Sequence, residues 1–221
     1  MRVLPRLLTS SIATLALWAA SSPARAEPEV IIDPSSLRII KSESGPVNYY
    51  SVMSEGGTKF VRARYVPPTK TAVLGFQTAD GDRRTTKKLR WTWRAMTLPN
   101  GGDECASGKE DSAAVVYVTW KRGLRYYAIK YVWSAVGKKG SVCDSMRNPF
   151  AAQDTVIVES GGPVGVWRSV EIDLAHHFRH HFANDDQTAS VPDFVGAAVM
   201  TDGDQTNSAS AADYGPFVLV R

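Results

Sequence analysis

The strongest constraint on the fold is a stretch in which apolar and polar residues alternate with a period of two. In the segment KKLRWTWRA, residues 87–95, every second side chain is apolar. The apolar members are Leu89, Trp91, Trp93 and Ala95. Successive side chains of a β-strand point to opposite faces of the sheet, so this pattern predicts a half-buried strand. We therefore expect Trp91 and Trp93 to be buried on one face, with Arg90 and Arg94 on the other.

Similar β-rich segments follow one another along the chain. AVVYVTW (114–120) and RYYAIKYVW (125–133) are separated by a short polar stretch, which predicts a hairpin. NYYSVMSEGGTKFVRARYV (48–66) predicts two strands around the turn Glu55-Gly56-Gly57. DTVIVES, VWRSVEI, FVGAAVM and PFVLV predict further strands. Many short strands separated by Gly, Pro, Asn and Asp, without alternating long helices or an internal repeat, predict an antiparallel β-sandwich or jelly roll.

The first 26 residues have the features of a secretory signal peptide. Arg2 and Arg6 precede an apolar run, and Ala24-Arg25-Ala26 fits a small-x-small cleavage site. A membrane anchor is the alternative, but the run is shorter than the roughly 20 apolar residues needed to span a bilayer. We expect cleavage after Ala26, a periplasmic or secreted location, and one β-sandwich domain over residues 27–221.

The expected location bears on the state of the two cysteines, Cys105 and Cys143. An even number of cysteines in an exported protein predicts a disulfide.

The charge argues against a nucleic-acid partner. Lys and Arg number 26 against 22 Asp and Glu, but Arg2, Arg6 and Arg25 belong to the leader. Without the leader the two signs nearly balance, so no overall field attracts nucleic acid. No later segment is long and apolar enough to span a membrane.

The motifs LRWTWRA, YYAIKYVW, HFRHHFA, AAVMTDGDQT and YGPFVLV occur in this order. In this respect the chain resembles the bacterial family of domain of unknown function 3047, over roughly Ser36 to Val220. The resemblance implies an exported β-sandwich similar in outline to jelly-roll carbohydrate-binding modules. It implies no activity.

One short helix is predicted at DLAHHFRHHF, residues 173–182. Asp173 can cap its N-terminus, because an Asp side chain accepts hydrogen bonds from the first free amides. Leu174, Phe178 and Phe182 recur every fourth residue and predict a buried stripe.

All four histidines of the chain lie on this helix. His176 and His180 are one turn apart, as are His177 and His181, and such pairs can chelate zinc, copper or nickel. Together with Asp173 they form a candidate metal site. The alternative is a solvated polar face, which we favour because Asp173 can be used as the cap and no other histidine completes the site.

A second candidate site is DGDQTNSASAAD, residues 202–213. Asp202, Asp204, Thr206 and Asp213 occupy positions one, three, five and twelve of a possible calcium loop. Asn207 stands at position six, where a left-handed residue is needed and Asn tolerates it. The alternative is a loop whose polar side chains bind its own backbone amides.

Enzyme signatures are lacking: there is no GxSxG elbow, phosphate-binding loop or dinucleotide fingerprint. Our leading hypothesis is an exported non-catalytic domain that binds a glycan or another cell-envelope polymer, partly through aromatic side chains. Most aromatic residues, including Trp91, Trp93 and Trp167, are expected in the core. One alternative is a β-sandwich glycoside hydrolase or lyase with paired carboxylates, such as Glu171 and Asp173 or Asp202 and Asp204. The other is a periplasmic metal-binding or scaffolding protein that uses the histidines.

Overall fold

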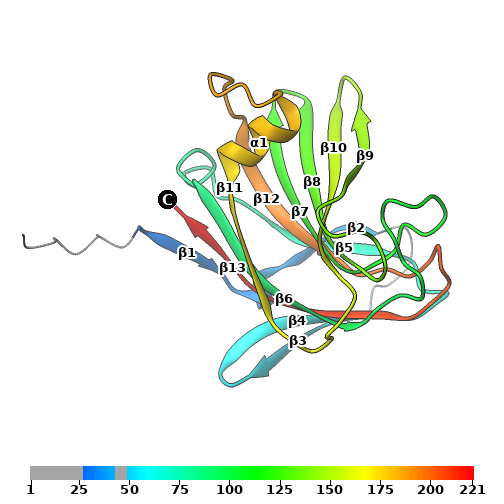
Figure 1. Cartoon of the computed structure of the whole chain (residues 1–221). Coiled ribbons are helices and arrows are strands. Elements are labelled where there is room, and N and C mark those ends of the chain that lie inside the picture. Colours follow the sequence, from blue (N-terminus) through cyan, green and yellow to red (C-terminus); the bar gives the residue numbers. More distant parts are fainter. Residues whose placement is uncertain (1–26, 43–48) are drawn as a thin grey trace, which may run out of the picture.

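The computed structural model describes residues 27–42 and 49–221, and they form two β-sheets packed face to face (Figure 1). The smaller sheet contains, in spatial order, β11 (Arg168–Asp173), β6 (Lys88–Thr97), β13 (Ser210–Val220), β4 (Thr58–Tyr65) and β3 (Tyr50–Glu55), with β1 (Glu29–Ile32) paired to β13. The larger sheet contains β2 (Arg38–Ser42), β5 (Ala72–Gln77), β12 (Asp193–Met200), β7 (Ser112–Arg122), β8 (Arg125–Ser134), β10 (Ala151–Ser160) and β9 (Val142–Arg147). A short 3-10 turn, η1 (Pro34–Ser36), and one helix, α1 (Leu174–Phe182), complete the described elements. The predicted β-sandwich is confirmed; the signal peptide expected at residues 1–26 lies outside the described residues.

One strand pair departs from the expected antiparallel pattern. β10 runs parallel to β8, with Ala151 opposite Tyr126 and Val156 opposite Tyr131. The reason is that β9 forms the edge of the sheet and β10 returns between β9 and β8. The predicted hairpin of β7 and β8 and the turn between β3 and β4 are both present.

The core between the sheets is rich in aromatic rings. Trp91 and Trp93 of β6 are fully buried, as the alternation predicted. Trp91 packs against Tyr131 with ring centroids 5.5 Å apart, and Trp93 packs against Trp133 at 6.1 Å. These contacts join the two sheets at their centres, because β6 lies in the smaller sheet and β8 in the larger.

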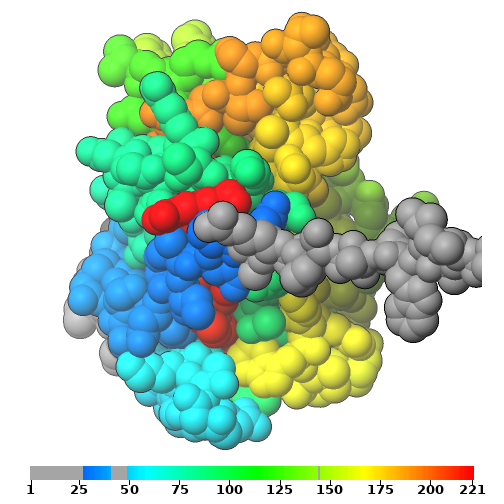
Figure 2. Space-filling view, turned by 90° about the vertical axis from the view of Figure 1, so that its left-hand side faces the viewer, coloured from blue at the N-terminus to red at the C-terminus, as the bar shows by residue number. Residues whose placement is uncertain are grey.

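Trp167 is an exception, and the prediction that it lies in the core is wrong. It is 36% exposed and lies on the outer face of the smaller sheet, where its ring centroid is 5.6 Å from that of Phe60 on β4. Figure 2 shows the β3–β4 hairpin in cyan next to the yellow segment that precedes β11. Residues 161–167 form a loop, and β11 begins only at Arg168, so the strand alternation does not extend to Trp167.

Helix α1 lies at one end of the sandwich (Figure 1). Asp173 caps it by accepting a hydrogen bond from the amide of His176 at 2.8 Å. Phe178 is buried against Trp120 and Tyr127 of the larger sheet, and Leu174 is also buried. The predicted apolar stripe is therefore confirmed for Leu174 and Phe178, whereas Phe182 is only partly buried against the same core. None of the described helices is long and apolar enough to cross a membrane.

Candidate functional site

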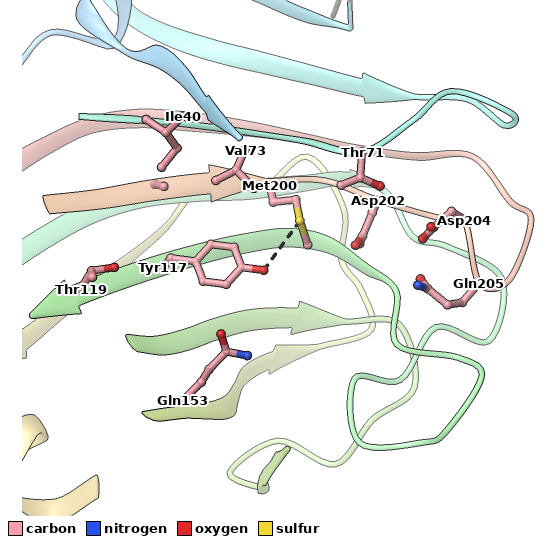
Figure 3. Close-up of a pocket in the computed structure, with 11 residues that line it drawn as sticks. Ile40, Thr71, Val73, Tyr117, Thr119, Gln153, Met200, Asp202, Asp204 and Gln205 are labelled. Atoms are coloured by element: carbon pink, nitrogen blue, oxygen red, sulfur yellow. Dashed lines mark hydrogen bonds between the residues drawn. The ribbon is translucent and has the colours of Figure 1, made fainter. Parts of the chain in front are cut away.

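The outer face of the larger sheet, which turns away from the core, carries an open cleft of about 370 Å³ (Figure 3). Its described lining residues come from five strands and the loops next to them. They are Ile40, Thr71, Val73, Tyr117, Thr119, Gln153, Ala198, Met200, Asp202, Asp204 and Gln205. A volume of this size falls within the range of small-ligand sites.

The hollow arises from the residues that meet in one row across the sheet. Gly75, Ala198, Tyr117, Lys130 and Thr155 are successive neighbours on five adjacent strands. A side chain at Gly75 would begin 2.7 Å from the Cβ atom of Ala198, so this position requires glycine. Of this row, Ala198 and Tyr117 line the cleft, where a small residue beside a tyrosine leaves a step in the surface.

The walls of the cleft differ in character. One side is apolar and contains Ile40, Val73 and Met200. The hydroxyl of Tyr117 donates to the sulfur of Met200 at 3.7 Å, which holds the aromatic ring against the apolar side (Figure 3). The other side presents hydroxyl and amide groups, including the hydroxyl of Thr119 and the amide of Gln153. The cleft therefore offers apolar contact and hydrogen bonds to the same ligand.

Two carboxyl groups stand at one end of the cleft, in the loop that follows β12 (Figure 3). Asp202 is buried and Asp204 is exposed. Gly203 between them is required, because a Cβ atom there would lie 2.0 Å from the carbonyl oxygen of Ser208. Asn207 has a φ of 48°, so the left-handed conformation expected at this residue is present.

Asp111, at the start of the strand next to this loop, completes the acidic group. Its carboxylate accepts hydrogen bonds from the amides of Gln205 at 3.3 Å and Thr206 at 2.6 Å, which fixes the loop. Ligand oxygens of Asp111, Asp202 and Asp204 lie within 4.8 Å of one another. Among the described residues this is the set that could hold a divalent cation, since carboxylate oxygens are the ligands that calcium prefers.

Burial controls the protonation of Asp202. Removal from water raises the pKa of this carboxyl to about 8; Lys130 opposes the rise, and the negative charges of Glu104 and Asp111 add to it. One oxygen of Asp202 accepts a hydrogen bond from the amide of Ser112 at 3.1 Å. Asp202 is therefore largely protonated at neutral pH.

A buried ion pair lies beside the cleft, next to Tyr117 on the same face of the sheet. The ammonium group of Lys130 is 2.6 Å from a carboxylate oxygen of Glu104. Burial by itself would lower the pKa of Lys130, but Tyr117, Glu104 and Asp202 outweigh this effect and raise it. Lys130 therefore carries its positive charge inside the protein.

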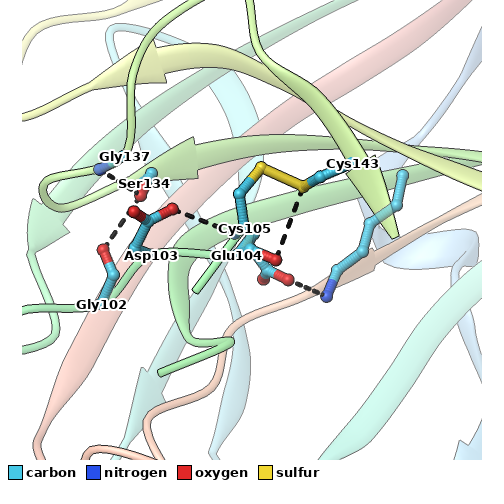
Figure 4. The surroundings of a disulfide bond; sticks show 8 residues. Gly102, Asp103, Glu104, Cys105, Ser134, Gly137 and Cys143 are labelled. Atoms are coloured by element: carbon cyan, nitrogen blue, oxygen red, sulfur yellow. Dashed lines mark hydrogen bonds and ion pairs between the residues drawn. A yellow bond between two sulfur atoms is a disulfide. The ribbon is translucent and has the colours of Figure 1, made fainter. Parts of the chain in front are cut away.

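The predicted disulfide supports this ion pair. Cys105 and Cys143 are bonded, and Cys105 directly follows Glu104 (Figure 4). The bond joins the loop between β6 and β7 to the edge strand β9. The loop that carries Glu104 is thereby fastened over the outer face of the sheet.

The four candidate calcium ligands do not come together, because Asp213 lies elsewhere. Asp213 is on β13 in the opposite sheet, where it is fully buried and bonded to Arg62 and Arg94 at 2.7 Å. The hydroxyl of Thr206 is paired with that of Ser208. Of the four expected ligands, only Asp202 and Asp204 are brought together, and Asp111 joins them.

The histidines likewise do not gather around one point. His176 and His180 are exposed, and His180 is 3.0 Å from Asp185. His177 and His181 instead turn toward the larger sheet, so the expectation of a uniformly solvated face is wrong for these two. Asp173 is used as the helix cap, as expected.

His177 and His181 each bond a residue of the sheet. Nδ1 of His177 is 2.7 Å from the hydroxyl of Tyr131, and Nδ1 of His181 is 2.9 Å from Asp154. Among the described residues, no three of these histidines and Asp173 place ligand atoms as close together as the three aspartates of the cleft do. The inner histidines attach the helix to the sheet.

The sequence interpretation missed Asp111, Glu104, Lys130 and Tyr117. The only sign was Lys130, a charged residue between apolar ones in RYYAIKYVW. A lysine at an outward position of a strand is ordinary, so it did not indicate a buried pair. Its partner Glu104 comes from a loop 26 residues earlier, and no local sequence pattern connects the two residues.

Fold and cleft together define a β-sandwich domain with an open, ligand-sized cleft on the outer face of its larger sheet. The chain belongs to the family described as Protein of unknown function (DUF3047), whose model matches residues 39–218. The resemblance inferred from the motifs is thus confirmed. No curated protein sequence matches the chain significantly.

Several solved structures are similar in fold. The xyloglucanase domain of NopAA, a type three effector from Sinorhizobium fredii in complex with cellobiose, is 11% identical, with 91% of this chain and all of that chain covered and a TM-score of 0.46. Endoglucanase 3 of Trichoderma harzianum, from family GH12, is 11% identical, with 90% and 100% covered and a TM-score of 0.44. The family 11 xylanase of Neocallimastix patriciarum is 10% identical, with 88% and 100% covered and a TM-score of 0.40. At these values the similarity concerns the arrangement of strands and not the activity.

Proposed function

We propose that this protein is an exported binding domain that holds a glycan, or a similar cell-envelope polymer, in the cleft of the larger sheet. The observation that carries the proposal is the composition of this cleft. An apolar side formed by Ile40, Val73 and Met200 faces a side with hydroxyl and amide groups. A sugar ring has the same two characters, because its C–H faces are apolar and its edges carry hydroxyl groups.

The cleft is also suited to binding without rearrangement. Its central residues are cross-strand neighbours in a continuous sheet, so their positions are set by backbone hydrogen bonds. A site that is already ordered avoids part of the entropy cost of binding.

Binding can be tested with a panel of neutral and acidic polysaccharides, by affinity electrophoresis and calorimetry. The variant Thr119→Ala/Gln153→Ala removes two polar groups of the cleft while leaving the apolar side intact. We expect it to bind the preferred polysaccharide at least about tenfold more weakly, a change of about 1.4 kcal/mol. The matched control is Gln187→Ala, a change of an exposed glutamine outside the cleft. If no polysaccharide binds, or if the cleft variant binds as tightly as the control, the proposal fails.

Hydrolysis of a glycan is the second candidate, and the raised pKa of Asp202 favours it. A protonated carboxyl beside a second carboxylate is the pair that a retaining glycosidase needs, at a separation of about 5 Å. However, Asp202 and Asp204 come from one loop at one end of the cleft, whereas the enzymes place the two groups on either side of the bond. This arrangement supports binding over catalysis.

One experiment distinguishes the binding domain from the hydrolase. Released reducing ends are measured with each polysaccharide that binds, using wild type and Asp202→Asn. Turnover by the wild type that Asp202→Asn abolishes, with binding retained, establishes the hydrolase. Binding without turnover supports the non-catalytic domain.

Export is part of the proposal. It is supported by the leader-like residues 1–26 and by the disulfide, since disulfides persist mainly in oxidising compartments. Fractionation of cells that express the full chain, followed by N-terminal sequencing, should find the protein outside the cytoplasm with Glu27 as its first residue. Uncleaved protein in the cytoplasm contradicts this part.

A further inference from the structure

Trp167 differs from the other tryptophans in the described part of the chain. Trp91, Trp93, Trp120 and Trp133 are at most 2% exposed, whereas Trp167 is 36% exposed. Large exposed aromatic rings that are held in place are characteristic of binding sites, because an apolar surface in water is unfavourable unless a ligand covers it. Trp167 is on the sheet opposite to the cleft, so it does not belong to the site already described.

The ring of Trp167 is fixed by a network of charges beneath it. The guanidinium of Arg94 lies 4.5 Å from the ring centroid, and Phe60 meets the ring edge-on. Arg94 cannot turn away, since it is bonded to Asp213 at 2.7 Å and to Glu55 at 2.6 Å. The tryptophan therefore stays in position without a ligand.

A hollow of about 330 Å³ opens beside this ring. Its walls include Phe60, Trp167 and the hairpin residues Glu55 and Thr58. Gly215 and Thr92 also line it, and a Cβ atom at position 215 would lie 2.1 Å from the hydroxyl of Thr92. Glycine here leaves room for Thr92, so the hollow contains a threonine hydroxyl beside an aromatic wall.

The charges around the hollow compensate one another. Arg62 and Arg94 are paired with Asp213 and Glu55, which gives two positive and two negative groups in one bonded network. A charged ligand would gain little from a balanced network. A neutral ligand with an apolar face and hydroxyl groups matches the aromatic ring, the threonine hydroxyls and the carboxylate of Glu55.

We propose that this hollow is a second binding site, which takes a neutral sugar ring stacked on Trp167 and hydrogen-bonded to Glu55 and Thr92. The site goes beyond the function proposed for the cleft, because it is on the other sheet and needs no residue of the cleft. If both sites bind, a long polysaccharide can bridge two domains or be held at two points, and its apparent affinity exceeds that of either site.

The test uses the full-length protein and a neutral probe, the β-1,4-linked glucose hexamer, at neutral pH. The variants are Trp167→Ala and Trp167→Tyr, with Phe150→Ala as the matched control because Phe150 is an exposed aromatic residue outside the hollow. Calorimetry gives the number of hexamers bound for each chain, and thermal melting checks that each variant is folded. We expect two bound hexamers for wild type and Phe150→Ala, and one for Trp167→Ala. Trp167→Tyr should retain the second site because its ring still stacks.

Tryptophan fluorescence provides an independent readout, because Trp167 is the exposed tryptophan of the described residues. In the cleft variant Thr119→Ala/Gln153→Ala, the hexamer should still change the emission and protect it from iodide quenching. Thr92→Val keeps the fluorophore of Trp167 but removes a hydroxyl of the hollow, and it should weaken the apparent affinity of the fluorescence response at least about tenfold.

The outcomes separate this site from the cleft. Binding of one hexamer that Trp167→Ala leaves unchanged overturns the second site and leaves the function of the cleft intact. Binding that Trp167→Ala removes and the cleft variant retains supports the second site even if the cleft binds no sugar. A fluorescence response to phosphatidylcholine vesicles but not to the hexamer also overturns the proposal, since Trp167 would then contact a lipid surface.

Discussion

Nδ1 of His181 lies 2.9 Å from a carboxylate oxygen of Asp154, and this bond connects helix α1 to strand β10 of the larger sheet. Both side chains are almost completely buried, and Asp154 is also paired with Arg147 at 2.8 Å. Arg147 in turn donates to the backbone carbonyl of His181 at 3.0 Å. The histidine cluster therefore contributes to the attachment of the helix.

Replacing His181 with Ala should destabilise the protein by about 1–3 kcal/mol, because it removes a bond to a buried carboxylate. His180→Ala is the matched control, since His180 is exposed, and it should stay within about 0.5 kcal/mol of wild type. Urea unfolding of the two variants at pH 7 measures both changes. Equal effects of the two substitutions contradict the assignment of an inner and an outer pair.

His177 should make the protein less stable in acid. Burial lowers the pKa of His177 to about 4, so between the usual value of 6.5 and 4 the unfolded chain binds a proton that the folded chain does not. Stability attributable to this residue is therefore complete above pH 6.5 and is lost as the pH falls toward 4. The difference in unfolding free energy between wild type and His177→Gln should change by up to about 1.4 kcal/mol per pH unit in this window. A difference that does not vary with pH is evidence against a buried neutral histidine.

Asp202 should have the opposite dependence. With a pKa of about 8 in the folded state and 3.8 in the unfolded state, the folded protein holds the proton between these values. The stability contributed by Asp202 is therefore lost as the pH rises from about 4 to about 8, with a slope of up to about 1.4 kcal/mol per pH unit. Asp202→Asn, which resembles the protonated acid, should gain on wild type over the same range. Thermal melts at pH 4.5 and pH 8 measure this, and a constant difference between the two proteins refutes it.

Phe178→Ala should lower the free energy of unfolding by about 3–5 kcal/mol, because the ring is buried against Trp120 and Tyr127 of the larger sheet. The change leaves a cavity at the end of the sandwich that α1 covers. Denaturant unfolding measures the change in the free energy of unfolding. The helix ends at Ala183, and substitutions beyond this residue should cause no comparable loss. A cost below about 1 kcal/mol is inconsistent with full burial.

Removal of the disulfide should lower stability by about 4 kcal/mol, the amount expected for a closed loop of this length in the chain-entropy model. The bond spans 38 residues of sequence. The variant Cys105→Ser/Cys143→Ser should also bind polysaccharide more weakly, because the loop with Glu104 is released from the outer face. Unfolding with and without reductant checks the first effect, and reductant should leave the double variant unchanged.

Several features could be predicted from the sequence because they depend on neighbouring residues. Alternation along β6 determined which side of the strand is buried, so Trp91 and Trp93 were placed correctly. The recurrence of Leu174 and Phe178 determined the buried side of α1 in the same way. Two cysteines in a chain predicted to be exported were enough to predict the single disulfide. In each case the periodicity or the count is a local or global property of the sequence and does not depend on strand order.

Only the tertiary structure decided which distant residues meet. Asp202 and Asp213 are close in sequence, yet β13 leaves the loop for the other sheet and takes Asp213 to Arg94. Asp111 comes from far earlier in the chain and joins Asp202, because β7 and β12 are neighbours in the larger sheet. The order of strands in a sheet follows from the packing of the whole core, and a charged side chain has no sequence pattern that reveals its partner. The physical basis of the cleft is therefore long-range strand pairing, whereas the strands themselves follow from local alternation of residues.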